Sequence, residues 1–241
     1  MASMTKREIA SLIDHTLLNS EAKIKEIILL CQEAIRYGFA SVCVNPCYVP
    51  VAALELKDSA VKISTVIGFP LGANTSDTKV FETIKAIENG ADEIDAVINV
   101  SDAKDGRFSK ISSEIAEIVQ ASKEAGVKKN NDIKVKIIIE TCLLDDDEIE
   151  SACLCAKKAG ADYIETSTGF ANPKGLDGNL LPNGASEYHV RLIRKIIGNE
   201  MGIKASAGIR SARMVRSMIT AGATRFGISN GPAIVENWTE D

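Results

Sequence analysis

Six polar side chains stand at or near the ends of short apolar runs, and their types suit carbonyl and proton-transfer chemistry. A lysine can attack a carbonyl carbon when its amine is unprotonated, and carboxylates can move protons to and from the reacting groups. If the runs are strands of one barrel, their carboxyl ends meet at one mouth, so side chains far apart in sequence become neighbours. The six are Asp14, Cys43, Asp95, Glu140, Glu165 and Lys204.

Glu165 and Lys204 are expected on consecutive strands, which lie about 4.8 Å apart in a sheet. Opposite charges at ~4 Å attract by about 4 kcal/mol at an effective dielectric of ~20, before desolvation is counted. Such a pair holds Lys204 as an ammonium and raises its pKa, which opposes attack on a carbonyl. One interpretation is a loss of imine chemistry; the other is a salt bridge that merely replaces one polar group by another.

The other members of the set have separate interpretations. Asp95 and Glu140 could form a carboxylate pair for acid/base catalysis that needs no lysine amine. Cys43 has no histidine placed to activate it, so an inert buried thiol is preferred to a nucleophile. Asp14 is expected to support neighbouring strand ends by hydrogen bonding.

Short β-branched runs alternate with amphipathic helical segments along the chain, which demands a parallel sheet. Eight units of this kind in 241 residues fit one (β/α)8 barrel domain over residues 1–241, and no G-x-G-x-x-G supports an open doubly wound sheet. The predicted helices include residues 22–37, 78–89, 111–125, 146–159 and 187–197. The predicted strands are residues 12–18, 41–44, 61–67, 93–98, 135–139, 163–166, 203–206 and 224–228.

Glycines mark the predicted connections. Gly90, Gly160 and Gly222 each follow a helical segment and precede a strand, which predicts left-handed helix ends. Residues 171–185 form the longest irregular stretch, after the sixth strand, and are predicted to be a lid or rim loop.

The segments after the last two predicted strands stand where barrels usually bind phosphate. Gly208 lets backbone amides approach an anion, and Ser229 offers a hydroxyl. A helix beginning near Asn230 would add its positive end. The glycines could instead only make turns, but we favour a phosphate site formed by Gly208, Ser229, Asn230 and Gly231.

Composition excludes several classes of protein. The chain is 45% hydrophobic and 25% charged, as in ordinary globular proteins, and its net charge of -5 without a long basic run gives no support to nucleic-acid binding. Six cysteines without C-x-x-C spacing indicate free thiols, and no segment approaches the ~20 apolar residues of a membrane span. His15 and His189 lack a third ligand, so no metal is predicted. We expect a cytoplasmic protein that binds neither nucleic acid nor membrane.

Motifs that run through nearly the whole chain carry a family resemblance. The most informative is ADYIETSTGF at residues 161–170. The others are IDHTLL (13–18), SVCVNP (41–46), TVIGFPLGA (65–73), EIDAVIN (93–99), IETCLL (139–144), KASAGIR (204–210) and GATRFGISNG (222–231). Together they resemble the deoxyribose-phosphate aldolases, a family of class I aldolases.

The resemblance implies a (β/α)8 barrel that reversibly cleaves 2-deoxy-D-ribose 5-phosphate to acetaldehyde and D-glyceraldehyde 3-phosphate, without a metal or organic cofactor. It places the family's Schiff-base lysine at Glu165. It gives the lysine matching Lys204 the role of lowering that amine's pKa, and the carboxylate matching Asp95 a role in proton transfer. Asp14, Cys43 and Thr166 are expected to support these groups.

Three departures from the family pattern fall on the same face as Glu165. Relatives usually have glycine where Ala207 stands and a different small-residue pattern at Asn230, and they often carry a C-terminal tyrosine, whereas no tyrosine follows Tyr188. We therefore expect a divergent member whose aldolase activity is absent or severely impaired, and which binds a sugar phosphate or serves a protein partner.

Two alternatives stay open at this point. In the first, Lys204 with Asp95 or other carboxylates has taken over and the protein is a working lyase or isomerase. In the second, Glu165 is an engineered replacement in an otherwise active aldolase. The ligand in either case is a small phosphorylated sugar or aldehyde, and relatives of this kind are often homo-oligomers.

Overall fold

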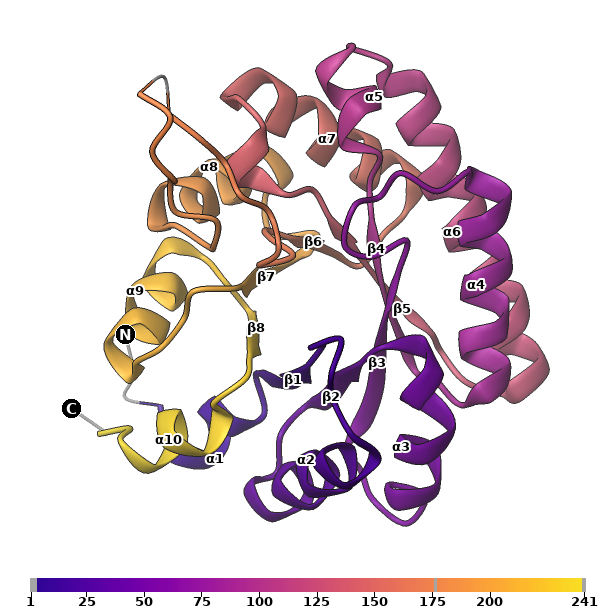
Figure 1. Cartoon of the computed structure of the whole chain (residues 1–241), viewed down its shortest axis with the longest axis vertical. Coiled ribbons are helices and arrows are strands. Elements are labelled where there is room, and N and C mark those ends of the chain that lie inside the picture. The colour runs from indigo at the N-terminus through magenta and orange to yellow at the C-terminus, as the bar shows by residue number, and fades with distance from the viewer. Residues whose placement is uncertain (1–3, 176, 240–241) are drawn as a thin grey trace.

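Eight parallel strands form a closed barrel in a computed structural model that describes residues 4–175 and 177–239. Each strand pairs with the next in sequence and β8 pairs with β1, which closes the ring that the helices surround in Figure 1. The predicted (β/α)8 barrel is confirmed. The strands are β1 (Ile13–Leu17), β2 (Ser41–Val44), β3 (Lys62–Ile67), β4 (Glu93–Val97), β5 (Lys134–Ile138), β6 (Tyr163–Glu165), β7 (Gly202–Ser206) and β8 (Arg225–Ile228).

The long helices match the predicted amphipathic segments, and α7 and α8 have the predicted bounds. Three short helices of five to seven residues, α1, α3 and α5, were not predicted, because so few residues do not display a helical period. A fourth short helix, α10, is the one expected near Asn230. The helices are α1 (Lys6–Ala10), α2 (Ile24–Tyr37), α3 (Val49–Glu55), α4 (Ser76–Asn89), α5 (Val100–Lys104), α6 (Phe108–Lys129), α7 (Asp146–Ala159), α8 (Glu187–Ile197), α9 (Ala212–Ala221) and α10 (Gly231–Glu236).

Alternating side chains give the barrel two chemically different surfaces. In β4, Ile94 and Ala96 belong to the hydrophobic core between strands and helices, while Glu93 and Asp95 are buried polar residues that the core does not include. In β7, Ile203 and Ala205 belong to the core and Lys204 does not. Because side chains alternate between the two faces of a strand, apolar residues cover the outside of the ring, and the charged residues of β4 and β7 point to its inside.

Glycines end the helices where the sequence predicted them. Gly160 and Gly222 follow α7 and α9 in the left-handed conformation, with φ of 80° and 117°, and Gly90 follows α4 with φ of 120°. Residues with a Cβ rarely adopt such angles. These positions let the chain leave each helix and enter the next strand within a few residues.

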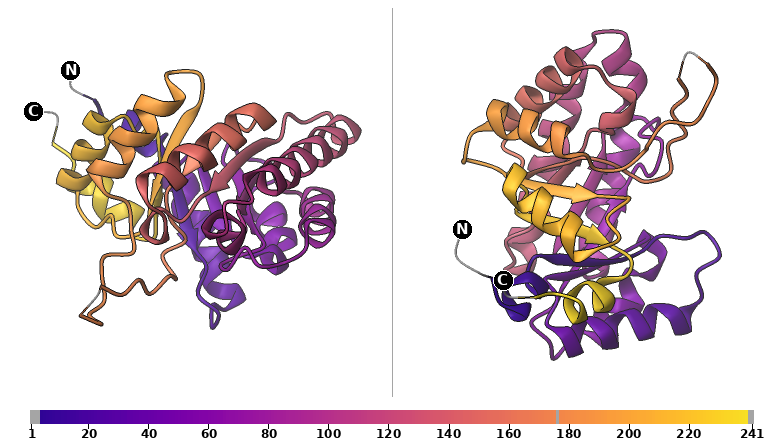
Figure 2. Two further views of the ribbon diagram at one scale, coloured as in Figure 1. Left: turned by 90° about the horizontal axis from the view of Figure 1, so that it is seen from above. Right: turned by 90° about the vertical axis from the view of Figure 1, so that its left-hand side faces the viewer.

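The segment between β6 and α8 projects from the barrel in both views of Figure 2. Within it an isolated antiparallel bridge joins Lys174 to Leu180, and the Asn183 side-chain amide donates to the Ala171 carbonyl at 2.8 Å. A lid function for this segment stays a prediction. No helix in the part of the chain that the structure describes is long and apolar enough to cross a membrane.

Candidate active site

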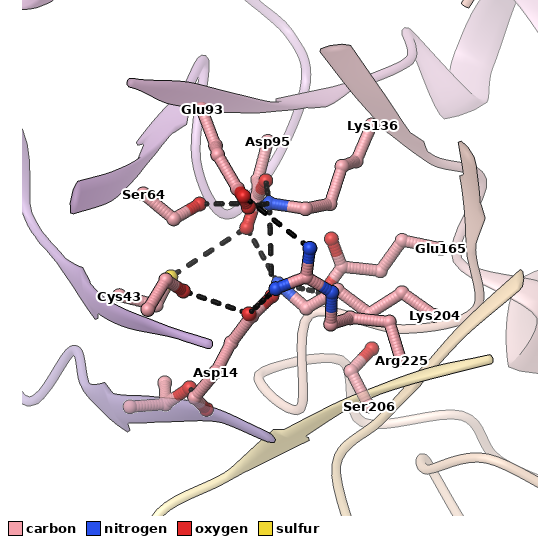
Figure 3. Close-up of polar contacts among 12 residues, drawn as sticks. Asp14, Cys43, Ser64, Glu93, Asp95, Lys136, Glu165, Lys204, Ser206 and Arg225 are labelled. Atoms are coloured by element: carbon pink, nitrogen blue, oxygen red, sulfur yellow. Dashed lines mark hydrogen bonds and ion pairs between the residues drawn. The ribbon is translucent and has the colours of Figure 1, made fainter. Parts of the chain in front are cut away.

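Charged side chains from six strands converge inside the barrel (Figure 3). Six of them are buried, and Arg225 is nearly so, with a side chain 13% exposed. Charges removed from water in this way must be paired with one another. We call these residues the interior charge cluster; it consists of Asp14 on β1, Glu93 and Asp95 on β4, Lys136 on β5, Glu165 on β6, Lys204 on β7 and Arg225 on β8.

Asp95 lies between the two lysines of the cluster. Its Oδ1 is 2.7 Å from Lys136 Nζ, and its Oδ2 is 2.5 Å from Lys204 Nζ. Burial alone raises the pKa of Asp95, but attraction to the two ammonium groups outweighs it and the pKa is lowered. Asp95 is therefore held as a carboxylate.

Asp14 on β1 and Glu93 on β4 pair with the remaining cations of the cluster. Asp14 Oδ1 accepts hydrogen bonds from Arg225 Nη1 at 2.8 Å and from Ser41 Oγ at 2.7 Å. Glu93 lies 2.5 Å from Lys136 Nζ and 3.3 Å from Arg225 Nη2. Each cation of the cluster therefore contacts at least two carboxylates.

Glu165 and Lys204 form the predicted ion pair. Their Cα atoms are register partners in β6 and β7, and Lys204 Nζ lies 3.2 Å from Glu165 Oε1. Burial by itself lowers the pKa of Lys204, but attraction to Asp95, Glu165 and Asp14 outweighs it, so the pKa is raised well above its ordinary value. Lys204 is an ammonium at neutral pH.

Glu165 is the least satisfied carboxylate of the cluster. Its Oε2 is buried and has no hydrogen-bond partner within residues 4–175 and 177–239. Burial raises the pKa of Glu165 to about 8, against the opposing attraction of Lys204. At neutral pH the neutral acid and the carboxylate are both accessible to it, as proton-transfer chemistry requires.

A cavity of about 250 Å³ opens above the cluster at the carboxyl ends of the strands. Both members of the Glu165–Lys204 pair line it, whereas Asp14 and Asp95 do not; both contact Lys204, and Asp95 also accepts from the Cys43 thiol at 3.6 Å. Its polar lining comes from Thr16, Asn19, Cys43, Glu165, Ser167, Thr168, Lys204, Ser206, Arg210 and Ser229.

Cys43 and Thr166 occupy supporting positions. Cys43 lines the cavity, and burial raises the pKa of its thiol well above the ordinary value, which agrees with an inert thiol. The Thr166 hydroxyl donates to the Ser206 carbonyl at 3.3 Å and so ties the end of β6 to β7.

Glu140 does not join Asp95, although the sequence suggested a carboxylate pair. No hydrogen bond or ion pair among the described residues links them; Glu140 instead accepts from the Thr168 backbone amide at 3.2 Å and from the Thr168 hydroxyl. Its backbone is left-handed, with φ of 55° and ψ of 62°, at a turn that directs the carboxylate toward the loop after β6. Strand-end spacing does not reveal such a turn.

The predicted phosphate site is only partly assembled at the cavity. Gly208 and Ser229 line it, and their backbone amides donate no hydrogen bond to any described residue, which leaves them available to an anion. Asn230 and Gly231 do not line it. The helix expected near Asn230 is the six-residue α10, which begins at Gly231.

Arg210 and Lys136 are important residues that the sequence analysis did not single out. Arg210 lines the cavity beside Gly208 and is the second cation there. Lys136 is fully buried in the middle of an apolar strand. A lysine inside such a strand must find buried carboxylates, and this signal could have placed it in the barrel interior.

The sequence was compared with protein families and with known proteins. The model of the DeoC/LacD family aldolases matches residues 9–237. The chain belongs to this aldolase family. A deoxyribose-phosphate aldolase of Caldanaerobacter subterraneus subsp. tengcongensis is 50% identical over 230 residues, which cover 95% of this chain and 93% of the relative. A deoxyribose-phosphate aldolase of Thermococcus kodakarensis is 48% identical over 235 residues, which cover 97% of this chain and 98% of the relative.

Solved structures agree with the family assignment. A putative deoxyribose-phosphate aldolase from Coccidioides immitis superposes with a TM-score of 0.87 at 38% identity, over 98% of this aldolase-family chain and 87% of the other. The deoxyribose phosphate aldolase of Aeropyrum pernix, described as a tetramer, gives 0.84 at 31% identity over 96% and 91% of the two chains.

Replacing Lys136 should test the interior charge cluster. Lys136→Met leaves three buried carboxylates without their shared cation, so we expect the free energy of unfolding to fall by about 3–5 kcal/mol. Lys134→Met on the same strand is the control; it removes solvent-accessible pairs with Asp132 at 2.8 Å and Asp162 at 3.2 Å and should cost about 1 kcal/mol or less. Urea unfolding at 25 °C measures both, and equal losses would contradict the central role of Lys136.

The raised pKa of Glu165 predicts a pH-dependent difference from Glu165→Gln. Because the folded pKa of about 8 exceeds the ordinary 4.5, the stability associated with the neutral acid is complete below 4.5 and is lost as pH rises to 8. The parent should weaken relative to the variant across this window, by roughly 1 kcal/mol per pH unit, and level off above it. Urea unfolding from pH 4.5 to 9 tests this; exposed Glu117→Gln on α6 should give a constant difference.

Ala207 is a non-glycine residue with a left-handed backbone, at φ of 63°. This conformation costs an alanine roughly 1–2 kcal/mol. We expect Ala207→Gly to raise the free energy of unfolding by up to about 1 kcal/mol, after the greater chain entropy of glycine is deducted. Ala207→Val should lower it, since a β-branched side chain fits this conformation poorly. Thermal unfolding compares the two variants, and the reverse order would contradict the assigned strain.

Proposed function

We propose that the protein is a carbon–carbon lyase that acts on a small phosphorylated sugar or aldehyde, with Lys204 as the amine and Asp95 as its proton partner. One observation carries the proposal: Lys204 is the only lysine, among the described residues, that lines the cavity. Relatives named deoxyribose-phosphate aldolase support the cleavage of 2-deoxy-D-ribose 5-phosphate to acetaldehyde and D-glyceraldehyde 3-phosphate as the reaction.

The amine must first lose a proton. Asp95 at 2.5 Å, and Glu165 and Asp14 each at 3.2 Å, are the carboxylates within reach of Lys204 Nζ. The neutral amine then attacks the carbonyl carbon, the carbinolamine loses water, and an imine remains. The hydroxyl on the second carbon from the imine carbon loses its proton, the carbon–carbon bond breaks, and its electron pair moves toward the imine, which releases the first aldehyde and leaves an enamine. Protonation of the enamine carbon restores an imine, and addition of water to this imine returns the amine and the second aldehyde.

Proton removal limits this route. The carboxylates around Lys204 stabilise its ammonium form, so only a small fraction is a nucleophile at neutral pH. Resemblance places the family's own Schiff-base lysine at Glu165, and a carboxylate there has the opposite effect on Lys204 from a second ammonium group. The proposed activity is therefore slow and rises with pH.

The phosphate end of the ligand is proposed to lie against Gly208, Ser229 and Arg210. These three residues line the cavity, and the amides of Gly208 and Ser229 have no backbone partner among the described residues; amides, hydroxyls and guanidinium groups all bind phosphate oxygens. The neutral end of the ligand then lies toward the Glu165–Lys204 pair. The tetrameric Aeropyrum pernix relative supports a homo-oligomer, and cytoplasmic location stays a prediction.

A second candidate is a binding protein without imine chemistry. The strongly stabilised ammonium of Lys204 favours it, since an amine that stays protonated cannot attack a carbonyl. The same cavity would then hold a sugar phosphate or present a ligand-dependent surface to a protein partner.

Reductive trapping separates the two candidates. The protein is incubated with acetaldehyde and borohydride at pH 7 and pH 9, and adducts are mapped by mass spectrometry. We expect an ethyl adduct on Lys204 that forms faster at pH 9, because the neutral fraction of an amine rises about tenfold per pH unit below its pKa. Glu165→Gln should accelerate the adduct by removing one carboxylate from Lys204.

Two further variants complete the test. Glu165→Lys supplies an amine at the position of the family's nucleophile and should form the fastest adduct. Lys204→Met should form none in the cavity. An adduct in Glu165→Lys but not in the parent would contradict the lyase proposal and favour the binding protein. Adducts of the parent that are confined to exposed lysines would lead to the same conclusion.

A further inference from the structure

The Glu165–Lys204 pair combines a base and an acid on one wall of the cavity. Glu165 is 4% exposed, its Oε2 has no partner among the described residues, and it lines the cavity. Lys204 Nζ contacts the other oxygen, Oε1, at 3.2 Å. One carboxylate oxygen is thus free while the other is oriented by a cation, which is an arrangement suited to taking a proton from a bound ligand.

A second unpartnered group lies at the same place. Ser167 is 2% exposed, lines the cavity and has a hydroxyl without a hydrogen-bond partner among the described residues. Two buried polar groups without partners on one cavity wall are costly unless a ligand or water bonds to them. Because both groups line the same cavity and Glu165 contacts Lys204, we expect a polar group of the ligand to bind there.

We propose that Glu165 acts as a general base that exchanges a proton on the carbon next to the carbonyl of a phosphorylated aldehyde, while the Lys204 ammonium stabilises the enolate oxygen. This activity rests on the ligand class of the proposed function but not on its imine. It uses Lys204 as a cation, whereas the lyase uses Lys204 as a neutral amine.

The step balances without any further reactant. Glu165 removes a proton from the α carbon, the carbon–hydrogen electron pair forms the carbon–carbon double bond, and the carbonyl π pair moves to oxygen. The Lys204 ammonium, held by Asp95 at 2.5 Å, donates to that oxygen. The proton on Glu165 exchanges with water, and a solvent proton returns to carbon. The net result is isotope exchange with no change in the ligand.

The groups around Glu165 fix the direction of its pH dependence. Lys204 on β7 and Lys136 on β5 favour its carboxylate, Asp95 on β4 opposes it, and Cys43 on β2 also faces the cavity. Burial is the largest influence and raises the pKa to about 8. The base form therefore accumulates as pH rises through 8, while Lys204 stays protonated.

Proton NMR in D2O tests the proposal with 2-deoxy-D-ribose 5-phosphate. Loss of the C2 proton signals reports exchange, and the appearance of acetaldehyde reports cleavage in the same sample. We expect the parent to exchange C2 protons faster than it cleaves the sugar, with a rate that rises to a plateau above pH 8. Glu165→Gln should lose at least about 100-fold in exchange, the scale of general-base catalysis.

The same variant should affect the two activities in opposite directions. Glu165→Gln is expected to lose exchange but to gain borohydride-trapped adduct on Lys204, and a purely structural role of Glu165 would lower both. Glu165→Asp should recover part of the exchange and its pH dependence, while exposed Glu117→Gln should match the parent. Exchange that persists in Glu165→Gln would contradict the role of Glu165 as a base. So would a parent that forms the borohydride-trapped adduct without exchange, and neither result would contradict the proposed lyase.

Discussion

Charge balance inside the barrel is the constraint on which the rest of this structure depends. Four carboxylates and three cations share a volume from which most solvent is excluded. If all seven are ionised the cluster carries one excess negative charge, and a proton on one acid removes it. Asp14 Oδ2 and Glu93 Oε2 also lack hydrogen bonds but lie within ion-pair distance of a lysine, whereas Glu165 Oε2 has neither a hydrogen bond nor an ion pair among the described residues. Glu165 also has a raised pKa, so it is the acid expected to hold the proton that removes the excess charge.

This balance links stability to chemistry. Asp95 binds Lys136 and Lys204 with its two oxygens, so the cation that anchors the cluster and the cation that reaches the cavity share one partner. A proton that moves on Glu165 therefore changes the environment of Lys204 directly and that of Lys136 through Asp95. The two proposed activities, imine formation and proton exchange, differ in the groups they require: the imine route needs Lys204 without its proton, and the exchange route needs Glu165 without its proton.

Much of this architecture could be predicted from the sequence. The alternation of apolar strand segments with helical segments predicted the barrel, which the structure confirms. The positions of Glu165 and Lys204 at the ends of consecutive strands correctly predicted that they are neighbours. Glu140 was misplaced because its left-handed turn is a local backbone feature that strand periodicity does not encode. Lys136 and Arg225 were missed because they lie within runs that otherwise predict buried strands, and the carboxylates that pair with them come from other strands.

Arg225 gives the barrel a particular order of assembly. It lies on β8 and binds Asp14 on β1, a residue 211 positions earlier in the chain. Until β8 has been synthesised, the ring is open and the acids of β1 and β4 lack one of their cations. Contacts of such sequence separation form late and slow folding. The pair that closes the interior charge cluster can therefore form only after β8 has been synthesised.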